Sequence, residues 1–148
     1  MNGISVTTSR IYLDSNAVIR FIESAETTIG SVFDRARIGL VRIFTSELTL
    51  AEVLVAPFRN AEHELVAAYD EFLKGDDLMT VVPIDRTILF QSANFRAVSG
   101  TRTPDSIHVA TAMATHCDLF ISSDKRLKMP DSILRLSVED ADRLDLWP

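Results

Sequence analysis

The sequence is short of several residue types, and each shortage excludes a class of protein or site. Its single cysteine, Cys117, cannot form an intramolecular disulfide, which excludes a disulfide-stapled domain and favours the reducing cytoplasm. The five glycines are scattered and include no dinucleotide-binding or P-loop spacing. No segment has the roughly 18 consecutive apolar residues of a membrane-spanning helix, and residues 1–10 lack the apolar core of a signal peptide. We therefore expect a cytoplasmic protein with no membrane partner.

The remaining composition is that of one globular domain. Of the 148 residues, 47% are hydrophobic and 24% are charged. This predicts a single domain spanning residues 1–148, with a core that buries roughly 70% of the surface exposed by the unfolded chain. The net charge of −6 disfavours an anionic partner, but residues 86–130 contain six basic and only three acidic side chains. Because nucleic-acid binding depends on local positive potential, the acidic balance weakens a nucleic-acid hypothesis without excluding it.

Two kinds of apolar segment alternate along the chain. Short apolar or β-branched runs predict strands, and segments with a helical repeat predict helices. The expected strands are residues 11–13, 41–45, 78–84, 119–121 and 133–134, and the expected helices are residues 17–22, 48–56, 61–74, 86–98, 103–116 and 137–144. The alternation indicates an α/β layered fold with a mainly parallel sheet, in which the site lies beyond the carboxyl ends of the strands.

Local signals predict where three of these helices begin or end. Pro57 is expected to stop the helix before it, because proline lacks the N–H that a helix interior requires. Asn60 is expected to cap the start of the next helix, and Gly75 to follow its end. Ser137 is expected to cap the last helix.

Four carboxylates stand out because of the apolar segments beside them. Asp14 ends the first strand, and Glu52 is the only ionisable residue in its helix. Asp105 lies in the first turn of an apolar helix, and Asp124 follows a strand by two serines. An acid on a buried element is unfavourable unless its charge is compensated. If the four acids converge in one pocket, their mutual repulsion requires protons or cations, and a divalent metal ion is the usual solution.

The ligand types select among metals. The four acids offer only oxygen, and no histidine or cysteine has metal-ligand spacing, which favours Mg²⁺ or Mn²⁺ over structural zinc. The residues alone leave a second interpretation open, in which the acids are scattered structural groups. In that case Asp105 would stabilise its helix N-terminus by about 0.3–1 kcal/mol. A nucleophile formed by Cys117 with His116 or His108 is not favoured, because cysteine at the end of a buried helix is commonly a core residue.

Four stretches carry a resemblance to a known family. Their order and spacing resemble the PIN-domain family of metal-dependent ribonucleases, with Ser122 where threonine is commoner and Ser106 where alanine is commoner. The matching stretches are YLDSN at 12–16, TSEL at 45–48 continuing to Glu52, PDSI at 104–107 followed by ATA at 110–112, and ISSD at 121–124.

The resemblance implies a three-layer α/β/α fold with a parallel sheet of about five strands. It also implies an Mg²⁺- or Mn²⁺-dependent endoribonuclease in which Asp14 and Asp105 make the closest metal contacts and Glu52 and Asp124 complete the cage. The same resemblance suggests supporting residues, with Asn16 and Ser122 orienting acids or water and with Arg102, Lys125 and Arg126 holding the RNA backbone.

Members of this length are similar to VapC-type toxins of bacterial toxin–antitoxin pairs. This implies RNA as substrate, a cognate antitoxin protein as partner and a homodimer. Two alternatives within the fold are a catalytically silent binding or regulatory module and a stand-alone RNA-processing nuclease. A phosphatase with Asp14 as covalent nucleophile ranks last, because that chemistry needs a second acid where the chain has Asn16.

Overall fold

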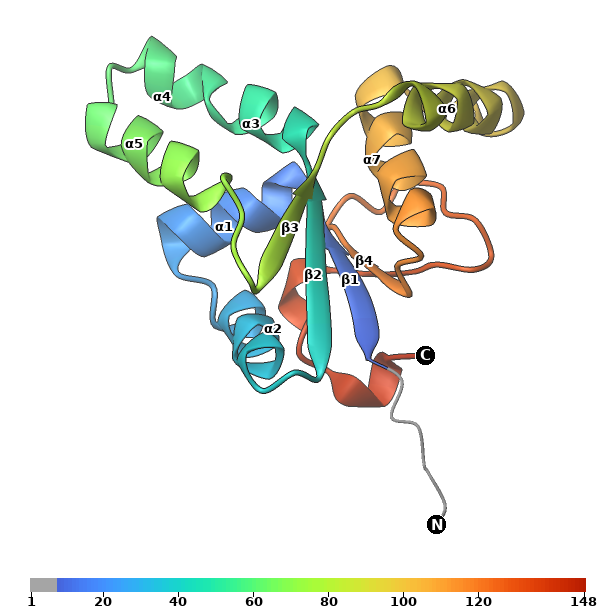
Figure 1. The fold of residues 1–148 in the computed structure, drawn as a ribbon, viewed down its shortest axis with the longest axis horizontal. Coiled ribbons are helices and arrows are strands. Elements are labelled where there is room, and N and C mark those ends of the chain that lie inside the picture. Colours follow the sequence, from blue (N-terminus) through green and yellow to red (C-terminus); the bar gives the residue numbers. More distant parts are fainter. Residues whose placement is uncertain (1–7) are drawn as a thin grey trace.

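The computed structural model describes residues 8–148, in which five parallel strands form one sheet (Figure 1). The order across the sheet is β3-β2-β1-β4-β5, so the first strand lies in the middle. The strands are β1 (Ser9–Leu13), β2 (Val41–Ser46), β3 (Met79–Val82), β4 (Leu119–Ile121) and β5 (Leu134–Leu136). The expected parallel sheet of about five strands is confirmed.

Helices cover both faces of the sheet and make the three layers. One face packs against α1 (Ser15–Ser24) and α2 (Thr27–Arg37). The other packs against α7 (Thr103–Ala114), which lies against α6 (Arg86–Ser99). The chain also leaves the carboxyl end of β2 through α3 (Glu47–Val53), α4 (Val55–Arg59) and α5 (His63–Phe72), on the side of that edge away from α6 (Figure 1).

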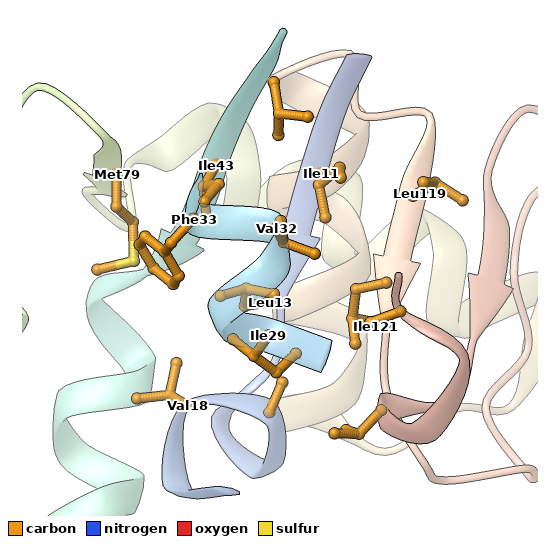
Figure 2. Close-up of a cluster of buried hydrophobic side chains, with 14 of the residues drawn as sticks. Ile11, Leu13, Val18, Ile29, Val32, Phe33, Ile43, Met79, Leu119 and Ile121 are labelled. Atoms are coloured by element: carbon orange, nitrogen blue, oxygen red, sulfur yellow. The ribbon is translucent and has the colours of Figure 1, made fainter. Parts of the chain in front are cut away.

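The strands are buried on both faces because their side chains alternate between two apolar clusters. Figure 2 shows the first cluster, in which Ile11 and Leu13 of the central strand meet Val32 of α2. Tyr12 points to the opposite face, where it stacks on Phe120 with ring centroids 4.8 Å apart. Burial on both sides explains why the strands are continuous apolar runs rather than alternating ones.

The helix expected at residues 48–56 is divided in two, and Pro57 does not end it. The break falls at Leu54, which closes α3 and opens α4. Pro57 is the third residue of α4, a position where no intrahelical N–H bond is needed. Because proline cannot donate to the carbonyl four residues earlier, the discontinuity precedes it by one turn.

Two other expected helix boundaries were wrong. Asn60 closes α4 instead of capping the next helix, and α5 begins at His63 after Ala61 takes a left-handed φ of 53°. The expected last helix is replaced by two short 3₁₀ turns, Val138–Asp140 and Leu144–Leu146. Ser137 does not cap a backbone N–H, because its hydroxyl donates to the Asp140 carboxylate at 3.1 Å.

None of the helices within residues 8–148 combines the length and the hydropathy needed to cross a membrane.

A pair of glycine substitutions tests the backbone assignment after α5. Gly75 has a φ of +78°, and a Cβ there would lie 3.0 Å from the Met79 carbonyl oxygen. Gly75→Ala should therefore lower the free energy of unfolding by about 1–2 kcal/mol. Gly30 lies inside α2, where an added Cβ would make an ordinary contact of 3.9 Å with the Phe21 ring, so Gly30→Ala should raise that free energy by about 0.5–1 kcal/mol. Urea unfolding of both variants measures the two changes, and equal signs would contradict the assignment.

Candidate active site at the carboxyl edge of the sheet

Asp14 stands where the central strand becomes a helix. It caps α1, with its Oδ1 accepting the backbone N–H of Ala17 at 2.9 Å. Its own backbone N–H donates to the Ile121 carbonyl at 3.3 Å, which continues the pairing of β1 with β4 past the end of the strand. The local sequence therefore places a buried carboxylate directly beside the residue that follows β4, Ser122.

Ser122 connects two of the acids. Its side chain is fully buried, its Oγ accepts the Asp124 backbone N–H at 3.1 Å, and its hydroxyl acts to lower the pKa of Asp14. Burial raises the pKa of Asp14, while Ser122, the Ala17 N–H and His108 oppose this rise. The Asp14 carboxyl is thus held in a desolvated position in which ionisation is disfavoured.

Glu52 reaches the same edge from α3. Ser46 caps this helix by accepting the Leu48 N–H at 3.0 Å, which fixes the transition from β2 and places Glu52 one and a half turns along. The Glu52 Oε1 lies 2.5 Å from His108 Nε2, and the proximity of Glu52 contributes to the raised pKa of Asp14. These two acids therefore share one electrostatic environment.

His108 and Tyr12 belong to the candidate site although sequence reasoning did not select them. The His108 Nδ1 lies 2.5 Å from the Tyr12 hydroxyl, and both side chains are buried. Burial, with Asp14 nearby, raises the pKa of Tyr12 well above its ordinary value. Two spacings could have revealed them: His108 is three residues after Asp105 on one helix, and Tyr12 is two residues before Asp14 on one strand.

Asp105 and Asp124 line a pocket of about 260 Å³ between α7 and the loop after β4. Each faces an exposed arginine: Arg102 Nη2 lies 3.3 Å from Asp105, and Arg126 Nε lies 3.4 Å from Asp124. The Arg126 backbone N–H, helped by its guanidinium, lowers the pKa of Asp124. Since both arginines are largely exposed, these pairs are weak and open to exchange.

The other residues expected at the site are distributed unevenly. Arg102 and Arg126 line the pocket, and so does Lys128, which was not expected there. Lys125 is exposed and does not line the pocket. Asn16 is exposed in the first turn of α1 and forms no hydrogen bond with its side chain within residues 8–148.

The sequence departure at Ser106 has a structural explanation. Its Oγ lies 2.7 Å from the Ser92 Oγ of α6 and donates to the Thr103 carbonyl at 2.8 Å. The extra hydroxyl is therefore satisfied between α6 and α7 and leaves the adjacent Asp105 free to face the pocket.

Cys117 is a core residue and not a nucleophile. Burial raises the pKa of its thiol to about 12, so the thiolate is not available near neutral pH. The neighbouring His116 is exposed.

The four acids have the donor atoms that a divalent ion needs. They are carboxylates at one edge of the sheet, the oxygen ligands that Mg²⁺ and Mn²⁺ prefer. Asp14 is buried and forms no salt bridge within residues 8–148. A metal ion would balance the negative charge of its carboxylate. In the same residues, no three Asp, Glu, His or Cys side chains are grouped closely enough to hold one ion. The four acids therefore match a divalent ion in the type of ligand atom they offer, although their side chains are not grouped around one point.

A parallel α/β sheet whose strands are followed at their carboxyl ends by acidic residues places the candidate site where sheets of this class bind their ligands. The sequence matches the PIN domain family over residues 11–132, which is most of its length. The chain therefore belongs to the PIN domain family, whose members are in general nucleases that use divalent metal ions. No curated protein matches the sequence significantly.

Solved structures share this fold at low sequence identity. VapBC2 from Rickettsia felis, bound to a DNA fragment from its promoter, gives a TM-score of 0.70 at 15% identity, covering 86% of this chain and 98% of the other. A toxin–antitoxin complex from Klebsiella pneumoniae gives 0.64 at 18%, covering 84% and 95%. VapC20 from Mycobacterium tuberculosis, a toxin that cleaves the sarcin–ricin loop, gives 0.58 at 12%, covering 74% and 86%. At these identities the likeness establishes the fold.

The raised pKa of Asp14 predicts a pH-dependent effect of Asp14→Asn. The unfolded chain loses this proton at a lower pH than the folded protein, so the ionised group reduces stability as pH rises above its ordinary pKa. Asparagine caps helices as well as aspartate does and carries no charge. In EDTA, Asp14→Asn should therefore have a higher urea midpoint than the wild type at pH 7, with the difference shrinking toward pH 4.

Asp145 provides the control for this experiment. It is exposed, and Arg143 lowers its pKa, so Asp145→Asn should give no gain at pH 7. A gain for Asp14→Asn that does not change with pH would contradict the assigned direction.

Proposed function

We propose that this protein is a metal-dependent endoribonuclease and the toxin of a toxin–antitoxin pair. The observation that carries the proposal is the mixed pocket, in which Asp105 and Asp124 lie beside Arg102, Arg126 and Lys128. Acids suited to a divalent ion next to cations suited to a phosphate are what phosphodiester hydrolysis requires. Membership of the PIN domain family and the fold shared with toxins support the same activity.

In this proposal the four acids have graded roles. Asp14 and Asp105 would contact Mg²⁺ or Mn²⁺ most closely, and Glu52 and Asp124 would complete its surroundings directly or through water. When bound, the ion supplies a water of lowered pKa and positive charge for the phosphate in the transition state.

Residues of the chain would do the rest. Ser122 would orient Asp124 by accepting its backbone N–H and would orient the nearby Asp14, and Asn16 would orient an acid or a water from the first turn of α1. Arg102 and Arg126 would exchange their weak carboxylate partners for the RNA backbone, with Lys125 adding positive charge from the surrounding surface. The product would carry a 5′-phosphate.

The proposed partners are RNA, a cognate antitoxin and a second copy of the chain. VapBC2 and the Klebsiella pneumoniae complex are assemblies of a toxin with its antitoxin, and their fold is that of this protein. A stand-alone RNA-processing nuclease would use the same site without an antitoxin.

One observation favours a second candidate, a catalytically silent binding module. Glu52, Asp105 and Asp124 each already face a basic side chain, and such pairs could replace a metal ion altogether.

RNA cleavage separates the two candidates. The wild type should cleave single-stranded RNA with Mg²⁺ or Mn²⁺ and stop in EDTA. Asp105→Asn should reduce the rate at least about 100-fold, because a positioned metal ion contributes several kcal/mol to such reactions. Asp131→Asn, at an exposed acid before β5, is the matched control and should keep full activity.

Two results would overturn the nuclease assignment. Cleavage that survives both EDTA and Asp105→Asn would exclude the proposed site. Tight Mn²⁺ binding with no turnover on any RNA would favour the silent module.

The role of the basic rim is tested by Arg126→Ala. Loss of one phosphate contact should raise KM and reduce the slope of log KM against log salt by about 0.7, the value for single-stranded nucleic acid. Arg42→Ala is the control, since Arg42 is exposed near the amino end of β2 and should leave KM unchanged. An unchanged salt slope in Arg126→Ala would show that this arginine does not bind the RNA backbone.

A further inference from the structure

One buried imidazole links three of the elements that present the acids. His108 lies on α7 with Asp105, bonds Glu52 on α3, and bonds Tyr12 on β1, two residues before Asp14. These contacts join positions 96 and 56 residues apart in the chain. His108 is therefore placed to control how the acids sit relative to one another.

The hydrogen-bond partners determine which ring nitrogen carries the proton. An ionised carboxylate only accepts hydrogen bonds, so the Nε2 that faces Glu52 must be the N–H. In a neutral ring the Nδ1 then accepts, and the Tyr12 hydroxyl is the donor that faces it. Tyr12 thus stabilises, by donating to Nδ1, the tautomer that the Glu52 carboxylate requires.

Packing fixes the Tyr12 end of this series of hydrogen-bonded side chains and leaves the Glu52 end accessible. The Tyr12 ring stacks on Phe120 and meets the His108 ring edge-on, with centroids 5.7 Å apart and planes at 68°. The His108 side chain is 4% exposed, whereas that of Glu52 is 32% exposed. Within residues 8–148 the second carboxylate oxygen of Glu52, Oε2, makes no hydrogen bond.

We propose that His108 is a positioning residue for the divalent-ion site. Its Nε2–H holds Oε1 of Glu52, Tyr12 holds the ring in the matching tautomer, and Oε2 remains available as a ligand. This role rests on the proposed function, because it assigns Glu52 to the ion. His108 is not a general base, since both ring nitrogens are engaged and the buried ring does not line the pocket formed by Asp105 and Asp124.

Two amide variants separate the functions of the two nitrogens. His108→Gln places an N–H donor near the position of Nε2, and His108→Asn places one near Nδ1. Mn²⁺ binding to the RNA-free protein should be close to wild type for His108→Gln and about 10–100-fold weaker for His108→Asn. His63→Asn, at an exposed histidine, is the control and should not change the affinity. Equal affinities for the Gln and Asn variants would overturn the proposal.

Nitrogen NMR of the metal-free protein gives a second readout. His108 should show its proton on Nε2 in the wild type, and Tyr12→Phe should shift the ring toward a mixture of tautomers. A proton on Nδ1 in the wild type would overturn the proposal, and this measurement decides the question even if His108→Asn does not fold.

RNA cleavage distinguishes this proposal from the proposed function. His108→Asn should lower kcat with KM unchanged, because His108 touches Glu52 and not the RNA, and His108→Gln should restore it. If the wild type cleaves no RNA, the nuclease assignment fails, while the tautomer and the Mn²⁺ affinities still test the role of His108. If RNA is cleaved but the two amide variants have the same kcat and Mn²⁺ affinity, only the role of His108 fails.

Discussion

Negative charge held at the edge of an apolar sheet is the constraint on which the rest of this structure depends. Asp14 ends a buried strand, and its carboxylate accepts the backbone N–H of Ala17. Glu52 lies on an apolar helix and is held by the buried His108. Asp105 and Asp124 face the pocket and rely on arginines two or three residues away. The buried acids are thus held by groups of the core, whereas the acids at the surface are held by weak, exposed ion pairs. A substrate can displace those exposed pairs.

The parallel topology brings the residues that follow successive strands to the same edge of the sheet. Each crossover returns the chain to the same edge, so residues after β1, β2 and β4 meet although long segments separate them. The central position of β1 gives Asp14 neighbours on both sides, β4 through Ile121 and α3 through its electrostatic contact with Glu52. The α6–α7 hairpin then brings Asp105 to this edge from the second face of the sheet.

The strands and the four acids could be predicted from the sequence, because hydrophobic periodicity and residue type are local properties. The apolar strands were recognisable because burial on both faces leaves continuous runs, and the acids because they interrupt such runs. Pro57 misled because its effect depends on its position within a helix, which tertiary packing decides. The partnership of His108 with Glu52 and Tyr12 could not be predicted, because no local pattern encodes a hydrogen bond between side chains on three separate elements.

The burial of Cys117 has a consequence for how copies of the chain can associate. Its thiol lies in the cluster that contains Tyr12 and Phe120, and the sequence has no other cysteine. While Cys117 stays buried, a disulfide cannot join two folded molecules, so contacts between copies of the chain must be noncovalent or use other chemistry. Because the buried native thiol is also unreactive, one cysteine introduced on the surface would be the sole point of attachment for a spectroscopic label.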